Sequence, residues 1–343
     1  MPVSESRKRF PLIGRNQMFN RRKFIAAVPA AALALSIGMS AAAHAQERPA
    51  GSPPWTIGFS QDTMDQPWRA FMVTSAQEQA KKYPELIKEF IFTDAKGTNE
   101  KQIADVEDLI SRGVDLIMMS PREAQALVPA VEAIKKAGIP LIVLDREVVG
   151  EDYNVFIGGN NLQIGEGLGK YAVDKLGDTW NFLEIEGVPG ATPTIQRHEG
   201  FASALVGKDG IKRLDAQPAN YDLAPAIPIV EDWVTRYRGQ FNAIYAHSDP
   251  MILGAINVLK GAGFKPGEVF LIGVDGQKEA FEAIKDGWLQ ATSIYATGGA
   301  LGVDMAVRVL KGEPVPKRIT TETPVITPEN VDEFYDANLR YVR

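Results

Sequence analysis

Short apolar runs alternate with amphipathic stretches along most of this chain, and that alternation restricts its fold more than any other feature. The runs are continuous in aliphatic residues, as in strands buried on both faces, and the stretches between them have helical periodicity. Strands that alternate with helices form parallel sheets covered on both sides, so the sequence predicts an α/β fold. The predicted strands are Thr56–Ser60, Phe90–Thr93, Asp115–Ser120, Pro140–Asp145, Asn154–Ile157, Trp180–Ile185, Ala243–His247, Val269–Asp275 and Gln290–Tyr295, and the predicted helices include Asn99–Ser111, Arg122–Ala137, Leu162–Leu176, Asp249–Ala262 and Gly299–Leu310.

Glycines follow several of the predicted helices. They occur in Arg112-Gly113, Ala137-Gly138, Gly261-Ala262-Gly263 and Lys311-Gly312. A glycine just past a helix adopts the left-handed conformation that ends the helix and turns the chain toward the next strand. We therefore expect these helices to end at the glycines.

The alternating pattern pauses at Gly158-Gly159-Asn160-Asn161 and then starts again. We interpret the pause as a crossover between two similar α/β lobes. The length agrees with this, because a chain of roughly 300 residues usually divides into two domains. Parallel α/β sheets bind ligands at the carboxyl ends of their strands, so the polar residues after each strand are the candidates for function.

The first 45 residues have the composition of a secretory signal peptide. A basic segment ends at Arg21-Arg22-Lys23, an apolar stretch runs from Ile25 to Met39, and Ala43-His44-Ala45 forms a small-x-small cleavage site. The apolar stretch is shorter than the roughly 20 residues of a spanning helix, which argues against a permanent anchor. The arginine pair leaves the twin-arginine and general secretory routes both open, and Met18 is an alternative start. We expect a cleaved signal and a periplasmic location.

The chain expected after cleavage is strongly acidic. Seven basic residues and one acid precede Ala45, so 30 basic (37 less 7) and 42 acidic residues (43 less 1) remain, a net charge of −12. Such a surface repels nucleic acid and anionic lipid. The sequence contains no cysteine, which excludes disulfides, thiolate metal sites and cysteine nucleophiles.

An aromatic residue and an arginine follow the first predicted strand. Pro67 marks a helix start, which places Trp68 and Arg69 in the first turn, at the carboxyl end of that strand. A sugar needs this combination, because the C–H face of its ring packs on an aromatic side chain while its hydroxyls pair with charged groups. The alternative is that Trp68 packs within its helix and Arg69 is a solvated charge.

Charged residues also stand at the ends of predicted strands in both halves of the sequence. Asp145 and Arg146 follow one strand directly, and Asp275 lies on a tight turn after another. Arg197 lies in an early helical turn after a glycine-rich loop, and Asp249 follows Ala243–His247. Taken singly, each could be an ion pair or a helix cap. Their common position at strand ends favours one shared site.

Six ordered motifs carry these residues: Gly58-Phe59-Ser60-Gln61 with Trp68-Arg69, Ser120-Pro121, Leu144-Asp145-Arg146, Arg197-x-x-Gly200-Phe201, Tyr245-Ala246-His247-Ser248-Asp249-x-Met251 and Val274-Asp275-Gly276. Together they resemble the ribose-type periplasmic sugar-binding proteins, and within these they are closest to the galactofuranose-binding type. The resemblance extends over nearly the whole mature chain, from about Ile57 to Val331.

The resemblance implies a fold of two Rossmann-like lobes with parallel sheets, joined by a three-strand hinge, which is the type I architecture of periplasmic binding proteins. The crossings are expected near Gly158–Asn160, Tyr295–Thr297 and Thr323–Val325. The first lobe would then comprise residues 55–158 and 297–323, and the second lobe residues 159–296 and 324–343.

The resemblance also implies a set of sugar contacts. Trp68 would stack on the ring, and Asp145, Arg146, Arg197 and Asp275 would grip its hydroxyls from the two lobes. Ser248 replaces the asparagine usual in such proteins, and a hydroxyl cannot make the two-sided contact of an amide. The implied contacts are Gln61, Asp65, Trp68, Arg69, Ser120, Asp145, Arg146, Arg197, Ser248, Asp275 and Thr297.

Other chemistry receives little support from the sequence. His198 and His247 cannot form a usual zinc site by themselves, and we expect neither a metal nor a cofactor. The run Gly165–Lys170 lacks the spacing of a phosphate loop and lies in a helical pattern. A glycoside hydrolase could use Asp145 and Asp275 as an acid/base pair, but both would contact sugar hydroxyls equally well.

The sequence therefore predicts a monomeric binding protein, not an enzyme, that captures a monosaccharide between two closing lobes. Its partners would be the permease subunits of an ABC importer in the inner membrane, and not nucleic acid. The alternative is a sensor that presents the sugar to a chemoreceptor or a sensor kinase. A pentose or a hexose, including its furanose form, would fit the predicted site.

Overall fold

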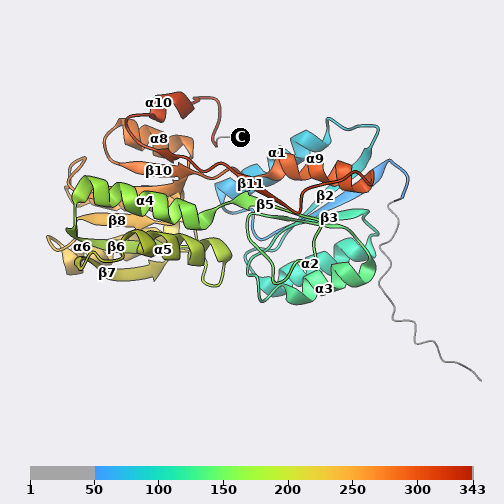
Figure 1. Ribbon diagram of the computed structural model, residues 1–343, viewed down its shortest axis with the longest axis horizontal. Helices are drawn as coiled ribbons and strands as arrows, with labels where there is room; N and C mark the ends of the chain where they lie inside the picture. The colour runs from blue at the N-terminus through green and yellow to red at the C-terminus, as the bar shows by residue number, and fades with distance from the viewer. Residues whose placement is uncertain (1–50, 342–343) are drawn as a thin grey trace, which may run out of the picture. The chain divides into compact units, whose positions relative to one another are not determined.

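The computed structural model describes residues 51–341, and the predicted signal peptide lies outside the described residues. Within that range no helix has both the length and the apolar composition needed to cross a membrane. The strands form two six-stranded sheets, as Figure 1 shows. This confirms the predicted α/β fold with two parallel lobes.

The first lobe is built on a wholly parallel sheet with the order β11-β5-β4-β3-β1-β2. Helices α1 and α9 cover one face of this sheet, and α2 and α3 cover the other (Figure 1). The strands are β1 (Trp55–Gln61), β2 (Ile87–Asp94), β3 (Leu116–Ser120), β4 (Leu141–Leu144), β5 (Val155–Gly159) and β11 (Arg318–Thr321), and the helices are α1 (Pro67–Ala80), α2 (Asn99–Ser111), α3 (Val128–Ala137) and α9 (Gly299–Leu310).

The second lobe repeats the plan with the order β12-β10-β9-β8-β6-β7, in which β12 alone is antiparallel among the described strands. The strands are β6 (Thr179–Glu186), β7 (Gly210–Pro218), β8 (Ala243–Ala246), β9 (Phe270–Asp275), β10 (Ala291–Ile294) and β12 (Val325–Ile326), and the helices are α4 (Asn161–Leu176), α5 (Thr192–Ala204), α6 (Leu223–Tyr237), α7 (Asp249–Gly261), α8 (Lys278–Lys285) and α10 (Val331–Phe334).

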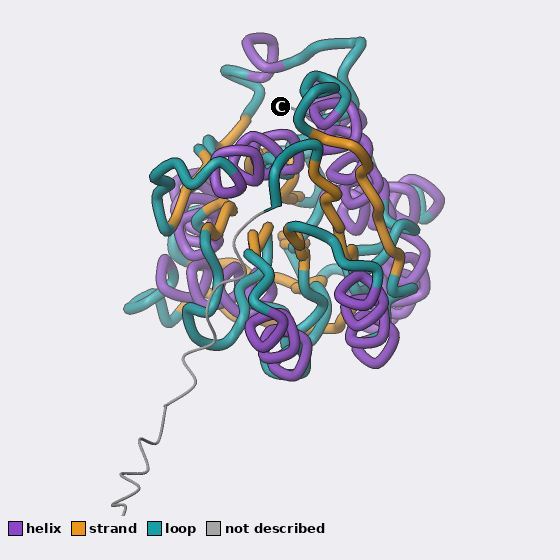
Figure 2. The backbone as a smooth tube through the Cα atoms, turned by 90° about the vertical axis from the view of Figure 1, so that its right-hand side faces the viewer, coloured by secondary structure: helices purple, strands orange, loops and turns teal. Residues whose placement is uncertain are grey.

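The chain passes three times between the two sheets. It leaves the first sheet after β5 and enters α4, returns between β10 and α9, and passes from β11 to β12 through residues 322–324. The tube in Figure 2 shows helices around the strands. Parallel α/β sheets bind ligands at the carboxyl ends of their strands, so a site is expected at these ends and near the crossings.

Apolar burial explains why the predicted strands formed. The described core residues include Ile57, Met118 and Ile142 in the first lobe and Ile244 and Leu271 in the second, each at most 1% exposed. The glycines at the helix ends also behave as predicted, because Gly113, Gly138, Gly263 and Gly312 all have φ between +66° and +86°.

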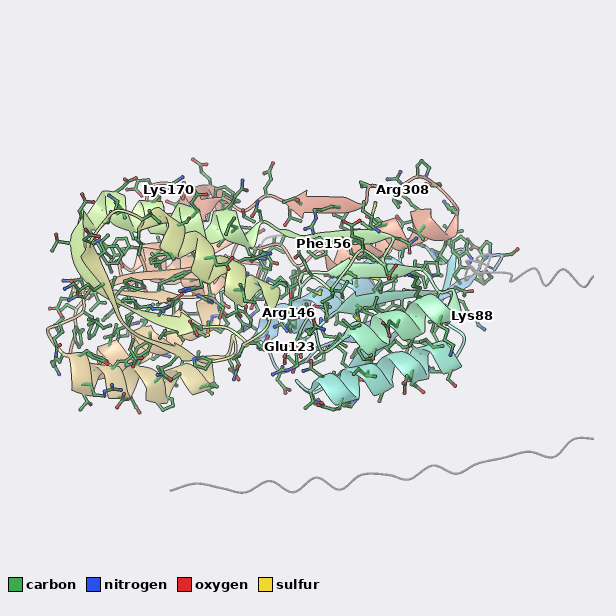
Figure 3. The ribbon with its side chains drawn as sticks, turned by 60° about the horizontal axis from the view of Figure 1, so that its bottom comes forward. Lys88, Glu123, Arg146, Phe156, Lys170 and Arg308 are labelled. Atoms are coloured by element: carbon green, nitrogen blue, oxygen red, sulfur yellow. The ribbon has the colours of Figure 1, made fainter. Side chains whose placement is uncertain are left out.

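Close packing of α4 against α5 positions Arg197 of the second lobe. A Cβ on Gly165 of α4 would lie 2.2 Å from the Arg197 carbonyl oxygen, and one on Gly200 of α5 would lie 2.1 Å from the Leu162 carbonyl oxygen. Only glycine allows α4 and α5 to approach this closely. The run Gly165–Lys170 is thus part of a helix interface, and Figure 3 shows Lys170 far from Arg146.

Candidate binding site

A cavity lies at the carboxyl ends of the strands, with walls from both lobes and from the crossing between β10 and α9. Its volume is about 30 Å³. That is roughly the space of one or two water molecules and well below the roughly 300–1,000 Å³ of small-molecule sites, so a sugar enters only when the side chains or the lobes move apart. Figure 3 shows Arg146 at the border between the lobes. The lining residues are Gln66, Trp68, Arg69, Asp145, Arg146, Pro193, Arg197, Tyr221, Pro250, Asp275 and Tyr295.

Asp145 is the carboxylate of the first lobe in this cavity. Its Oδ2 accepts a hydrogen bond from Arg69 Nη2 at 2.9 Å, and its Oδ1 accepts one from the hydroxyl of Tyr295 at 2.9 Å. Its backbone has φ of +67°, a conformation that non-glycine residues adopt at a cost. The strained backbone turns the carboxylate into the cavity, where only 5% of the residue is exposed.

Arg146 offers donors that no described side chain uses. Its Nη1 donates to Asp62 Oδ2 and to the Arg122 carbonyl oxygen, both at 2.8 Å. Its Nε and Nη2 are buried and have no hydrogen-bond partner among residues 51–341. An unsatisfied buried donor costs about 1–3 kcal/mol. The two free N–H groups therefore favour a ligand with acceptor oxygens.

Asp62 compensates the buried guanidinium groups from behind the cavity. It is fully buried and lies 2.8 Å from Arg146 Nη1, 3.2 Å from Arg122 Nη1 and 3.7 Å from Arg69 Nε. Burial by itself would raise the pKa of Asp62, but the three guanidinium groups outweigh it and hold that pKa below its usual value. Asp62 therefore stays ionised and fixes the arginines in place.

Arg197 is the cation of the second lobe in this cavity. Its Nε donates to Asn161 Oδ1 at 2.9 Å, and its Nη1 donates to the carbonyl oxygen of His247. The guanidinium lies 4.6 Å from the centre of the Tyr295 ring. Contacts with α4, β8 and the crossing segment leave this side chain little freedom, so the site is preorganised on this side.

Asp275 faces Arg197 without a close ion pair. The nearest approach is 3.9 Å, between Asp275 Oδ1 and Arg197 Nη1. Burial raises the pKa of Asp275 well above its usual value, and the neighbouring Asp249 carboxylate raises it further against the effect of Arg197. Its φ of +132° is again unusual for a side-chain-bearing residue. A ligand hydroxyl that bridges Asp275 and Arg197 would satisfy both.

A buried network holds the segment that binds Arg197. Glu184 Oε1 accepts from His247 Nε2 at 2.9 Å and pairs with His198 Nδ1 at 2.9 Å, and Glu184 Oε2 accepts from Arg213 Nη1 at 2.7 Å. His247 is fully buried and its carbonyl oxygen accepts from Arg197. His247 is thus a hydrogen-bonded residue directly after β8.

This network gives a pH-dependent stability prediction. Burial would raise the pKa of Glu184, but hydrogen bonds from His198, His247 and Arg213 hold it far below its ordinary value of 4.5. A depressed pKa contributes stability that is present above pH 4.5 and is lost as the pH falls through the folded-state value. Glu184→Gln is therefore expected to lower the free energy of unfolding by about 2 kcal/mol at pH 7.

Urea unfolding at pH 7 and at successively lower pH measures this effect. The difference between wild type and Glu184→Gln should shrink below pH 4.5, while Glu186→Gln serves as a matched control with little effect. A difference that stayed constant down to pH 3 would rule out the ionised carboxylate as its source.

The structure brings most of the predicted contacts to one place. Gln61 and Ser120 stand behind the cavity, where Gln61 Oε1 and Ser120 Oγ accept from Arg69 Nη1 at 3.1 and 2.8 Å. They position Arg69 and do not line the cavity. The predicted residues that line it are Trp68, Arg69, Asp145, Arg146, Arg197 and Asp275.

Three of the predicted contacts lie elsewhere. Asp65 is exposed to solvent in the loop before α1. Ser248 is buried as the residue before α7, and its Oγ has no hydrogen-bond partner in the described part of the chain, but it does not line this cavity. Thr297 lines a different cavity on the hinge. Tyr295, two residues earlier in the same crossing segment, lines the first cavity instead.

Trp68 has a neighbour that the sequence did not reveal. Its indole ring stacks on Tyr295 with ring centres 5.3 Å apart and an angle of 18° between the planes, and its Nε1 donates to the Tyr295 carbonyl oxygen at 2.8 Å. One face of the indole is therefore covered, and a ligand reaches only the remainder. Tyr221, Gln66 and Asp62 were also missed, and the positive φ of Tyr221, +66°, follows no sequence signal.

Comparison with known proteins identifies the family. A family model described as periplasmic binding protein domain matches residues 57–314. This chain belongs to the periplasmic binding protein family. Family membership makes it a binding protein and not an enzyme, so the glycoside hydrolase alternative is set aside.

Curated relatives align with the binding protein over most of its length. The ribose import binding protein RbsB of Bacillus subtilis is 31% identical over 268 residues, which are 78% of this chain and 85% of that protein. The galactofuranose-binding protein YtfQ of Escherichia coli is 30% identical over 305 residues, 86% of this chain and 95% of that protein.

A solved structure agrees with the same fold. The periplasmic binding protein component of the arabinose ABC transporter from Shewanella sp. ANA-3, bound to alpha and beta-L-arabinofuranose, has a TM-score of 0.76 and 29% identity to the binding protein. The match covers 81% of this chain and 93% of that one.

Proposed function

We propose that this monosaccharide-binding protein of an ABC sugar importer takes its ligand as a furanose, in the manner of the galactofuranose-binding type. Two relatives support the ring form, because one is named for galactofuranose and the other was solved with arabinofuranose.

The observation that carries the proposed site is the pair of unused donors on Arg146. Asp62 holds the guanidinium through Nη1, and Nε and Nη2 have no hydrogen-bond partner among residues 51–341. A guanidinium fork matches two acceptor oxygens that lie side by side. Adjacent hydroxyls of a sugar provide such a pair, and the same hydroxyls would donate hydrogen bonds to Asp145 of the same lobe.

The lobes are proposed to close on the sugar as two units, residues 55–158 with 297–323 and residues 159–296 with 324–343. Contacts across the cleft support this. Gln66 Nε2 donates to the Asn220 carbonyl oxygen at 2.7 Å, and the Glu147 backbone N–H donates to Thr192 Oγ1 at 3.0 Å. A ligand that touches both lobes shifts the population toward this closed state.

The ring form can be read from the bound sugar. Carbon-13 NMR of galactose and arabinose labelled at C1 separates furanose from pyranose by the chemical shift of the anomeric carbon. We expect the protein to enrich the furanose signal of at least one of these sugars. Enrichment of a pyranose signal alone would refute the furanose assignment and leave monosaccharide binding intact.

Export and assembly complete the proposal. Residues 1–45 are proposed to be a cleaved signal peptide that delivers a monomer to the periplasm, where it meets the permease subunits. The mass of the protein purified from the periplasmic fraction, together with its elution volume, tests both points. A mass that includes residues 1–45 or a stable dimer would contradict them.

A further inference from the structure

A second cavity lies on the hinge. It has a volume of about 570 Å³, within the roughly 300–1,000 Å³ of small-molecule sites. Its walls come from α1 and α9 of the first lobe, from the two nearby crossings and from α10 of the second lobe. The side chains of Phe71, Leu301 and Phe334 make much of this wall apolar. We call it the hinge cavity.

The N-terminus of α9 opens into the hinge cavity. Gly298, Gly299 and Ala300 all line it, and the helix begins with neither a side-chain cap nor an acidic residue in its first turn. The first N–H groups of a helix have no partner within the helix, and its dipole makes this end positive. The 12 residues of α9 are enough for both effects.

Unpartnered hydroxyls mark the same place. Thr297 precedes the α9 cap, is only 7% exposed and lines the hinge cavity, and no hydrogen bond of its side chain occurs within the described residues. Thr321 also lines this cavity, and its Oγ1 is buried without a hydrogen-bond partner in residues 51–341. Buried polar side chains of folded proteins normally make a hydrogen bond, so the Thr297 hydroxyl at this cavity can donate to a ligand oxygen.

The charged residues of the hinge cavity stand at its rim. Glu78, Lys82 and Glu322 are exposed to solvent. Charges in such positions are screened over about 8–10 Å by physiological salt. The α9 N-terminus therefore determines which charge is favoured at the inner end of the cavity, and it favours an anion.

We propose that the hinge cavity binds a small carboxylate with an apolar body, of the aromatic-acid class. The carboxylate oxygens accept hydrogen bonds from the first N–H groups of α9 and from the Thr297 hydroxyl. The apolar body packs against Phe71, Leu301 and Phe334. This site is distinct from the sugar cavity and goes beyond the proposed function.

The hinge cavity shares a wall with the sugar cavity. Tyr295 lines the sugar cavity, whereas its neighbours Ile294 and Ala296 line the hinge cavity. Both lobes contribute residues to each cavity, so an opening of the hinge changes the shape of both cavities. Binding at one site is therefore coupled to binding at the other, and the coupling is reciprocal.

Fluorine-19 NMR titration of the purified protein with 4-fluorobenzoate tests the proposal, with 4-fluorobenzyl alcohol as the uncharged control. We expect saturable binding of the acid, with the alcohol binding several-fold more weakly. Thr297→Val keeps the shape of the side chain and removes its hydroxyl, and it should weaken the acid by roughly fivefold. Thr320→Val, at an exposed threonine of β11, should leave the affinity unchanged.

Two further variants locate the bound acid. Ala300→Phe should fill the hinge cavity and remove binding of both probes, while Asp145→Ala should remove sugar binding and leave the acid bound. Three results would overturn the proposal: no saturation by the acid, equal binding of the acid and the alcohol, or loss of the acid in Asp145→Ala with retention in Thr297→Val. The last result would place the acid in the sugar cavity.

Discussion

Asp145→Ala is expected to weaken sugar binding by at least about 100-fold while the protein stays folded. The carboxylate accepts from Arg69 and from Tyr295, and its removal leaves both donors with one partner fewer as well as removing the sugar contact. Two charge-assisted hydrogen bonds of roughly 1.5 kcal/mol each correspond to that factor. Isothermal titration calorimetry measures the affinity, and thermal unfolding measures the fold.

The fold should survive because Arg69 keeps other partners. Ser120 Oγ lies 2.8 Å from Arg69 Nη1, and Asp62 lies 3.7 Å from Arg69 Nε. Asp145→Asn is a second variant that tolerates the positive φ and preserves the shape, and it should also bind weakly. Asp65→Ala removes an exposed carboxylate outside the cavity and should bind normally. Unaltered affinity in Asp145→Ala would remove Asp145 from the site.

Arg146→Lys is expected to weaken sugar binding about as much as Asp145→Ala does. We expect only a small loss of stability. A lysine preserves the positive charge beside Asp62, but it lacks the Nε and Nη2 donors that have no hydrogen-bond partner in the described residues. Loss of two contacts with sugar oxygens costs about 3 kcal/mol, or roughly 100-fold in affinity. The free energy of unfolding should fall by only about 1–2 kcal/mol.

Arg122→Lys is the matched control for Arg146→Lys. Arg122 also pairs with Asp62, at 3.2 Å, but it does not line the cavity. Its conversion to lysine should leave the sugar affinity within a factor of about three, which is less than 1 kcal/mol. If Arg122→Lys and Arg146→Lys lost sugar binding equally, the Nε and Nη2 donors of Arg146 would have no separate role in binding the sugar.

Much of the fold could be predicted because its strands are buried on both faces. Strands such as β4 and β8 consist of apolar residues without interruption. Short runs of this kind between amphipathic helices are typical of buried parallel strands. The edge strand β7 was missed because its residues are partly exposed and polar, as Lys212 and Arg213 show. Helix α6 was missed because prolines interrupt its pattern, among them Pro228 in its interior.

The site could be predicted in outline because function in this fold concentrates at strand ends. Asp145 and Arg146 directly follow β4 and Asp275 is the last residue of β9, so their place needed no knowledge of the tertiary structure. Tyr295 and Thr297 lie two residues apart in one crossing segment but line different cavities, and no sequence pattern separates them. The stacking of Tyr295 on Trp68 joins residues far apart in sequence, and only the folded chain reveals it.

The most direct test of this account is a calorimetric titration of the purified protein with a panel of pentoses, hexoses and polyols. The account predicts that at least one monosaccharide binds with one-to-one stoichiometry, and that this binding is lost in Asp145→Ala and in Arg146→Lys but not in Asp65→Ala. Binding that persists in both cavity variants, or a panel in which no monosaccharide binds, would contradict it.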